Sequence, residues 1–165
     1  MKAVVSGPLS FISHAALSRA CLLLCAACLL ASCSIPNLEE TDCREARDRV
    51  REFYSFHFGN DMHLTEENVR LREKHLTRRL FRDLLNEAVA LPVKTTEYFT
   101  ATATNDLPKA FRVGECKVVQ PGDAVQFDVL LFWKDDIRTE QRHVSASLKK
   151  EDDNWLIDSV SPLDK

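Results

Sequence analysis

The sequence predicts an α+β domain in which N-terminal helices pack on a curved antiparallel sheet. Apolar residues recur every three or four positions between residues 41 and 90, the period of helices with one buried face. From residue 110 onward, apolar and polar residues alternate in runs separated by turns such as Pro121-Gly122-Asp123. Because the helices precede the strands instead of alternating with them, the order is that of an α+β fold.

Residues 1–32 have the composition of a secretory signal peptide. They contain no Asp or Glu, carry positive charge at Lys2 and Arg19, and continue into an apolar run over residues 21–31. The alternative, a membrane-spanning helix, needs about 20 apolar residues to cross the hydrocarbon layer. The run has about half that length, so we expect a signal that is removed.

The segment Leu30-Ala31-Ser32-Cys33 resembles the lipobox of bacterial lipoproteins. The resemblance implies that the chain is cut before Cys33, that the Cys33 thiol receives diacylglycerol, and that fatty acyl chains such as palmitate anchor the protein. Two or more acyl chains give stable membrane attachment. By the same resemblance, Ser34 favours a periplasm-facing place in the cell envelope, at the outer membrane of a two-membrane host. The alternative is an ordinary secreted protein cut nearby.

The mature chain divides into a short tether, residues 33–40, and one domain, residues 41–165. Three of the six cysteines leave with the signal and Cys33 carries the lipid, so Cys43 and Cys116 remain as a pair. In an oxidising compartment we expect a disulfide between them, with two buried free thiols as the alternative. Zinc is disfavoured because no CxxC or paired-histidine spacing accompanies them.

The first helix is expected to begin near Thr41 and to end at Gly59. Asp42 and Glu45 fit a capping box, and Gly59 fits a left-handed C-cap. The face expected to be buried consists of Cys43, Ala46, Val50, Phe53, Tyr54 and His57.

A second helical stretch is expected over residues 65–90, in two pieces. Thr77 can cap the second piece, and Pro92 closes the helical half. The apolar stripe of the second piece is Leu80, Phe81, Leu84, Leu85 and Ala88.

Four strands are expected to form a meander, and the turn between its second and third strands fixes a register. The strands cover residues 111–119, 125–133, 138–150 and 155–160, with Gly114 at a bulge. A two-residue loop at Asp135-Asp136 pairs Lys134 with Ile137 and therefore Phe127 with Val144. This register keeps the apolar residues on one face. The other face carries Gln126, Asp128, Leu130 and Phe132 opposite Ser145, His143, Gln141 and Thr139.

Four short segments resemble a family of bacterial lipoproteins that carry a domain of unknown function (domain of unknown function 3828). They are Phe53-Tyr54, Leu76-Thr77-Arg78-Arg79-Leu80, Ala110-Phe111-Arg112-Val113-Gly114 and Trp155-Leu156-Ile157. The resemblance covers roughly residues 43–160 and implies a nuclear-transport-factor-2-like, or cystatin-like, cone. Since these are packing motifs, the resemblance implies a fold and assigns no functional residue.

Composition and motifs disfavour several function classes. Without Lys2 and Arg19 the chain keeps 20 basic against 25 acidic residues, a balance that does not suggest nucleic acid. No GxSxG, HExxH, P-loop or Rossmann pattern occurs, and we expect no cofactor and no metal. Four possible metal ligands cluster around one loop: His57, Asp61, His63 and Glu66. We favour a solvated helix end there, with a metal site as the alternative. A basic stretch contains Arg70, Arg72, Lys74, Arg78, Arg79 and Arg82. Because acidic residues are interspersed among them, we favour a salt-bridged face over a membrane-binding patch.

Two groups of residues are candidate sites. Asp128 and His143 are expected to be cross-strand neighbours, either an acid–base pair or, as we favour, an exposed ion pair on the face away from the helices. A cone-shaped fold would also enclose a pocket. Its candidate lining residues, which otherwise simply form the core, are Tyr54, His57, Phe127, Val129, Leu131 and Trp133.

The sequence therefore favours a non-enzymatic, membrane-anchored domain that binds a small apolar ligand, a lipid or a cell-envelope partner. The alternatives are an isomerase or hydrolase-like enzyme that uses the cone pocket, and a structural protein that pairs through its sheet. For the last we expect a weak homodimer, because Leu130 and Phe132 have no helix expected above them.

Overall fold

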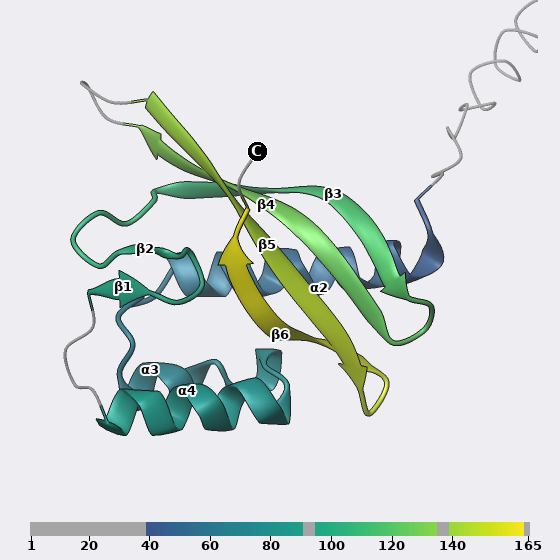
Figure 1. The fold of residues 1–165 in the computed structure, drawn as a ribbon, viewed down its shortest axis with the longest axis horizontal. Coiled ribbons are helices and arrows are strands. Elements are labelled where there is room, and N and C mark those ends of the chain that lie inside the picture. Colours follow the sequence, from purple (N-terminus) through teal and green to yellow (C-terminus); the bar gives the residue numbers. More distant parts are fainter. Residues whose placement is uncertain (1–38, 91–94, 135–138, 164–165) are drawn as a thin grey trace, which may run out of the picture. The chain divides into compact units, whose positions relative to one another are not determined.

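The computed structural model of the chain describes residues 39–90, 95–134 and 139–163, which form an α+β domain as predicted (Figure 1). Cys33, most of the tether, Pro92 and the Asp135-Asp136 turn lie outside the described residues. None of the described helices is long and apolar enough to cross a membrane. The elements are α2 (Thr41–Phe58), α3 (Glu66–Leu71), the 3-10 helix η1 (Glu73–His75), α4 (Arg78–Ala90), β1 (Thr96–Glu97), β2 (Thr102–Ala103), β3 (Ala110–Gln120), β4 (Ala124–Lys134), β5 (Thr139–Glu151) and β6 (Asn154–Pro162).

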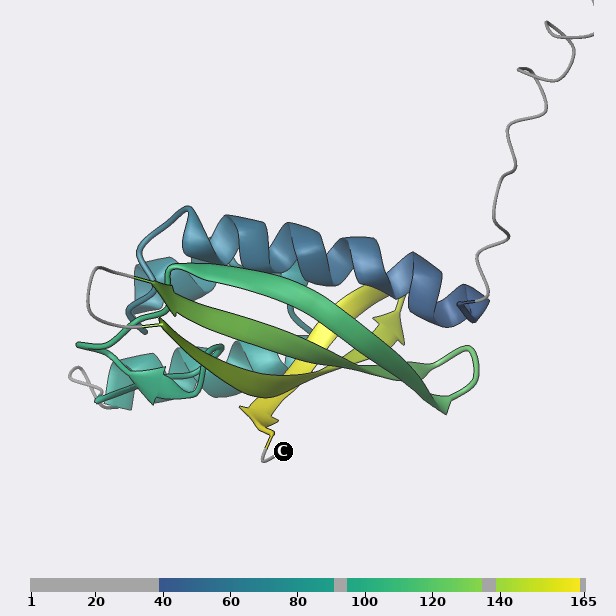
Figure 2. The same cartoon turned by 90° about the horizontal axis from the view of Figure 1, so that it is seen from above.

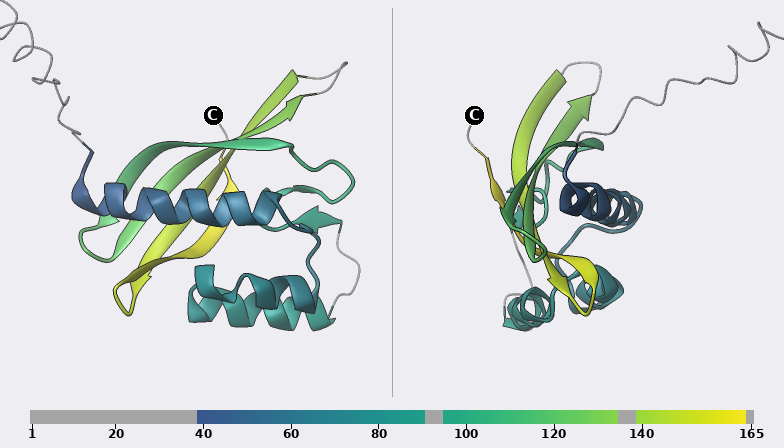
Figure 3. Two further views of the ribbon diagram at one scale, coloured as in Figure 1. Left: turned by 180° about the vertical axis from the view of Figure 1, so that it is seen from behind. Right: turned by 90° about the vertical axis from the view of Figure 1, so that its right-hand side faces the viewer.

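The last four strands form one antiparallel meander in the order β3-β4-β5-β6. Figure 2 shows α2 lying along this sheet, and Figure 3 shows the sheet curving past the helix. α3 packs on α4, and α4 contacts β6. The core therefore fills the space between α2 and the inward faces of the strands, with side chains such as Val50, Phe127 and Leu148 fully buried.

α2 covers the expected residues and buries the expected face, but neither of its ends is built as predicted. The six residues of that face are each 2% exposed or less. The N-cap is Glu40, which makes no side-chain capping bond, and the Asp42 carboxylate instead accepts the backbone N–H of Gly122 at 2.7 Å. Gly59 is right-handed, with φ of −82°. Asp42 thus ties the helix to the β3–β4 turn instead of closing a capping box.

Threonine caps set the starts of the two later helices. Thr65 accepts the N–H of Asn68 at 3.2 Å, and Thr77 accepts the N–H of Leu80 at 3.2 Å, the Thr77 cap being the predicted one. Of the predicted α4 stripe, Leu80, Leu84 and Ala88 are buried. The remaining two, Phe81 and Leu85, pack against the core from its margin.

The predicted bulge at Gly114 is confirmed, because the β3–β4 register shifts between Val113 and Cys116. A Cβ at position 114 would lie 3.1 Å from the Asp128 carbonyl oxygen, so the close approach of the two strands there suits glycine. At the next turn Gly122 adopts a positive φ of 75°.

The predicted β4–β5 register is wrong by two residues. Lys134 pairs with Thr139 and Phe127 with Ala146, because four residues, 135–138, separate the paired ends instead of two. A shift of two is one full side-chain period, so the apolar residues remain on the inward face. On the outward face Asp128 now pairs with Ser145, and Leu130 pairs with His143.

The segment between η1 and α4 covers the outer edge of β6. Leu76 forms a parallel bridge with Ile157, and the Thr77 N–H donates to the Ile157 carbonyl at 2.9 Å. The Thr77 hydroxyl also donates to Asp158 at 3.0 Å. One short segment therefore pairs a sheet edge that would otherwise be open.

The small hairpin of β1 and β2 was not predicted. Its register pairs Thr96 with Ala103 and Glu97 with Thr102. Ala101, in the connecting turn, has a positive φ of 52°. This hairpin carries a buried carboxylate, Glu97, that is central to the polar network described below.

Candidate functional site

A cleft of about 400 Å³ lies between the helical half and the β5–β6 turn. α2 contributes Arg49 and Glu52, and the segment from η1 into α4 contributes the next wall. The β5–β6 hairpin contributes the third wall. The residues of the last two walls are Glu73, Lys74, His75, Leu76, Arg78, Leu148, Glu151, Asp152, Asn154, Trp155, Leu156 and Ile157.

The apolar residues of the cleft are nearly all buried, whereas its charged residues are exposed. Leu76, Leu148, Trp155 and Ile157 are 4% exposed or less. By contrast, the side chains of Arg49, Lys74 and Arg78 are 52%, 67% and 75% exposed. The cleft therefore has an apolar base and a charged rim.

The rim cations are paired with rim carboxylates. Glu52 lies 3.1 Å from Arg49 and 3.8 Å from Lys74. Arg78 lies 3.7 Å from Glu151 and also pairs with Asp152. Since Glu73 adds a further carboxylate, the lining carries three cations against four anions and is close to neutral.

Two buried nitrogens of this lining have no hydrogen-bond partner among the described residues. They are Nε2 of His75 and Nε1 of Trp155, on side chains that are 6% and 4% exposed. The other indole, Trp133, donates to the Asp106 carbonyl at 3.1 Å. A buried polar group left unpaired costs about 1–3 kcal/mol, so each of these two nitrogens calls for a partner such as a water or a ligand; the third unpaired buried nitrogen, His57 Nε2, lies in the core.

Short-range packing holds the two side chains in place. The His75 ring lies edge-on to Phe53 at 5.8 Å and tilted against Phe56 at 5.5 Å. Burial, followed by the neighbouring Lys74 charge, lowers the pKa of His75 below its ordinary value of 6.5. His75 is therefore neutral at pH 7. The Lys150 ammonium lies 5.6 Å over the Trp155 indole and restricts that ring.

A fully buried polar network lies near the C-terminal end of α2. Arg72, His57 and Glu97 are 2%, 0% and 1% exposed. The Arg72 guanidinium donates to His57 Nδ1 at 3.0 Å, and His57 Nε2 lies 3.4 Å from the Glu97 carboxylate. Because a guanidinium can only donate, Nδ1 must be the acceptor and the proton must sit on Nε2.

Further hydrogen bonds satisfy both ends of the network. Arg72 also donates to the carbonyls of Asn68 and Asp61, at 2.7 and 2.8 Å. Glu97 accepts the N–H groups of Phe99 and Thr100 at 3.0 and 2.6 Å. Burial alone would raise the pKa of Glu97, but bonds from His57, Phe99 and Thr100 lower it on balance. The network joins α2, α3 and the β1–β2 hairpin.

The six residues predicted to line a cone pocket lie in the packed core, each 3% exposed or less. The two expected polar anchors are bound internally: the Tyr54 hydroxyl donates to the Phe99 carbonyl at 3.0 Å, and His57 belongs to the buried network. Only Phe127 reaches one of the described hollows, a depression of about 190 Å³ on the sheet. Val129, Leu131 and Trp133 fill the interior beside it.

Asp128 and His143 meet despite the corrected register. They are diagonal rather than direct neighbours, and His143 Nδ1 lies 2.8 Å from Asp128 Oδ1. Their side chains are 14% and 30% exposed. Leu130, expected to be exposed on the same face, is only 5% exposed, whereas Phe132 is half-buried.

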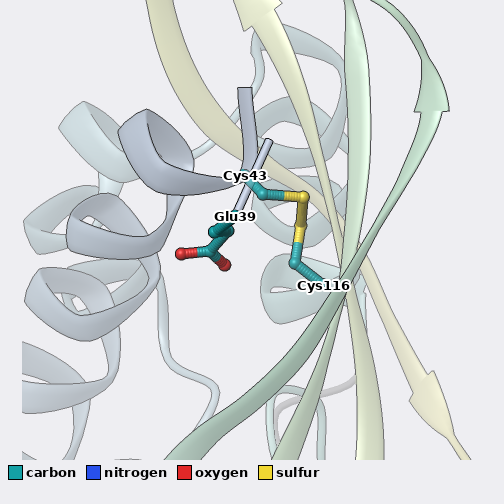
Figure 4. Close-up of side chains that lie close together, drawn as sticks. All are labelled: Glu39, Cys43 and Cys116. Carbon is teal, nitrogen blue, oxygen red and sulfur yellow. A yellow bond between two sulfur atoms is a disulfide. The ribbon is translucent and has the colours of Figure 1, made fainter. Parts of the chain in front are cut away.

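The disulfide between Cys43 and Cys116 is present and joins the first turn of α2 to β3 (Figure 4). Glu39 lies beside it and is bound by Arg47, which also donates to the Gly114 carbonyl at 2.8 Å. Sulfurs joined in a disulfide are not thiolate ligands, so this group of one carboxylate and two cysteines is not a metal site.

The residues of the loop after α2 do not gather into a metal site either. His57 is buried in the network, while Asp61 and His63 pair at the surface at 2.6 Å. Bonds from the backbone and side chain of His63 lower the pKa of Asp61 to about 2. The basic stretch is salt-bridged, with Arg70 bound to Glu66 and Arg79 to Asp83 and Asp158.

Sequence reasoning did not identify His75 and Trp155 as cleft residues, or Arg72 and Glu97 as members of a buried network. His75 and Arg72 stand within a run of charged residues that is typical of a solvated face, and Trp155 fits a strand core. A sequence signal existed only for Trp155, a large polar-edged side chain beside an Asp-Asp-Asn turn.

No family model matches this chain, and no curated protein matches it. Among solved structures, the intermembrane space region of chloroplast protein ARC6 is similar, at 13% identity. The match covers 79% of this chain and 100% of that chain, with a TM-score of 0.44. A likeness of this size carries no inference about function.

Proposed function

We propose that this protein is a lipid-anchored domain of the cell envelope that binds a ligand or partner without catalysis, and that the 400 Å³ cleft is its binding site. The observation that carries the binding proposal is the pair of buried, unpartnered nitrogens of His75 and Trp155 in the cleft lining. The Leu30-Ala31-Ser32-Cys33 motif supports the anchor. The disulfide fits an oxidising compartment such as the periplasm.

We further propose membership of the nuclear-transport-factor-2-like cone, within the lipoprotein family that the four sequence segments resemble. The helices-first order and the curved four-stranded meander support this. The ligand site would differ from the interior pocket expected of a cone, since side chains such as Phe127 and Leu131 are packed.

Binding is favoured over catalysis because the cleft lacks an oriented acid–base pair. Among the described contacts, no hydrogen bond joins the His75 ring to a carboxylate, the partner that would orient and charge it. The second candidate, an enzyme, is favoured only by the Asp128–His143 pair, which lies beside hollows of about 190 and 340 Å³ on the outer sheet face. Activity abolished by His143→Gln would favour that candidate.

A thermal-shift screen against lipids, fatty acids, glycans and peptides tests the binding proposal. A ligand at 100 times its dissociation constant stabilises the folded state by about 2.7 kcal/mol, which raises the melting temperature by several degrees. We expect the increase to be about halved in Trp155→Phe and kept in His143→Gln. If no ligand class raises the melting temperature, the binding proposal fails.

Membrane fractionation tests the anchor separately. We expect Cys33→Ala to leave the membrane fraction or to accumulate unprocessed. A Cys33→Ala protein that stays with membranes at the mass of the natural protein would contradict the lipobox assignment.

A further inference from the structure

We infer that the cleft takes an uncharged amide group, as a peptide segment presents it, with Trp155 and His75 as the two residues that recognise it. This inference deepens the proposed binding function and rests on it. Three properties of the lining support it: the bonds that its unpaired nitrogens can make, the pairing of its charges, and the burial of its aromatic and apolar side chains.

The unpaired nitrogens require a ligand with an oxygen acceptor. An indole Nε1–H can only donate, so Trp155 needs an acceptor atom. His75 is neutral, and its Nε2 donates or accepts according to the tautomer. A peptide segment offers both carbonyl oxygens and N–H groups, so it can supply partners of the kind that each nitrogen needs.

The rim charges favour a ligand without net charge. Glu52 holds Arg49 and Lys74, while Glu151 and Asp152 hold Arg78. An anionic ligand would have to displace one of these carboxylates and would enter a lining that already has one anion in excess. A neutral amide leaves every pair intact.

The two other neutral ligand classes fit less well. A sugar usually stacks on an open aromatic face, and Trp155 is 4% exposed and lies under Lys150. A purely apolar ligand would leave both nitrogens unpaired. A peptide segment can instead place its aliphatic side chains on the apolar base of Leu76, Leu148 and Ile157.

Both nitrogens are buried, so a ligand reaches them only after neighbouring side chains move. The rim consists of long, exposed side chains such as Lys74 and Arg78, which can rotate without a change in the backbone.

The two tryptophans make the inference testable by NMR of the indole N–H signals. The protein is isolated from an expressing bacterium in neutral detergent micelles and titrated with N-acetyl-trialanine amide. Sodium acetate, methyl glucoside and octanol are the comparison probes. We expect the blocked peptide alone to move the Trp155 signal downfield to saturation, while the Trp133 signal stays, because Trp133 already donates to Asp106.

Matched variants separate recognition from folding. Trp155→Phe should weaken the peptide about tenfold, the equivalent of one hydrogen bond of ~1.4 kcal/mol. Trp133→Phe should leave its affinity unchanged. In each variant the remaining indole signal reports whether the protein is folded.

Two results would overturn the inference, and they differ in what they say of the proposed function. If acetate, glucoside or octanol moves the Trp155 signal to saturation and the blocked peptide does not, the cleft binds ligands but not amides. If no probe moves it, the amide inference fails, and the binding function fails with it only when the thermal-shift screen is also negative.

Discussion

At the scale of single residues, Glu97 is the carboxylate on which the buried network depends. Glu97→Gln would remove the larger of the two carboxylate charges that favour the buried Arg72 guanidinium, and we expect a loss of about 3–5 kcal/mol in the free energy of unfolding. Urea denaturation measures the loss. The matched control is Glu52→Gln, whose side chain is 46% exposed and which should cost less than about 1 kcal/mol. Equal losses in the two variants would show that the network contributes little.

His75 gives the protein a pH dependence that can be isolated by substitution. Its pKa is lowered on folding, so between the folded pKa and the ordinary value of 6.5 the unfolded chain binds more protons. The His75 contribution to stability is therefore complete above pH 6.5 and is lost as the pH falls toward the folded pKa. We expect His75→Gln to be less stable than the natural protein at pH 7.5 and to lose less stability between pH 7.5 and pH 5. Melting curves at the two pH values compare the slopes, and parallel slopes would contradict the prediction.

At the scale of elements, Thr77 connects the start of α4 to the edge of β6. Its hydroxyl caps α4 and donates to Asp158, which also pairs with Arg79 and Lys149 at 3.1 and 3.3 Å. We expect Thr77→Val, which keeps the shape and removes both bonds, to cost about 2–3 kcal/mol in urea denaturation. Thr65→Val removes only the cap of the six-residue α3 and should cost about 1 kcal/mol. If Thr77→Val lowered the free energy of unfolding no more than Thr65→Val, Thr77 would not connect α4 to β6.

The sequence could predict those elements in which apolar residues recur at a regular spacing. The buried face of α2 follows from its 3.6-residue spacing, and the inward face of β4 follows from alternation. The assignment of inward-facing residues stayed correct although the predicted β4–β5 register was wrong by two residues, because two residues are one full side-chain period. β1 and β2 have two residues each, too few to show a regular spacing, so nothing in the sequence marked Glu97 as a buried carboxylate.

The candidate site could not be predicted for a related reason. The cleft arises where residues 73–78 meet residues 148–157, a contact between segments far apart in the chain. Local patterns say nothing about which two distant surfaces will leave a gap. The pairing of Cys43 with Cys116 was predictable because elimination left only those two thiols.

At the scale of the whole molecule, the disulfide holds the helical half to the sheet. It joins residues 73 positions apart, and on the chain-entropy model a loop of that length contributes about 4 kcal/mol. We expect Cys43→Ala with Cys116→Ala to lose about this much in urea denaturation. Dithiothreitol should lower the melting temperature of the natural protein and leave that of the double variant unchanged. Equal responses of the two proteins to dithiothreitol would show that the bond does not stabilise the fold.

The position of this bond also decides how the domain carries mechanical load. A pull applied between the N-terminal side and the C-terminus enters the domain at Glu39 and passes from Cys43 directly into Cys116 and β3. α2 beyond its first turn, α3, α4 and the β1–β2 hairpin lie within the covalent loop, outside the covalent path of that tension. Those residues would extend over roughly 250 Å as a free chain, and the bond withholds that length from the stretched molecule. In a protein tethered to one surface and drawn by a partner, only the chain after Cys116 could therefore be pulled out, and the helical wall of the cleft would feel the force only through its contacts with β6.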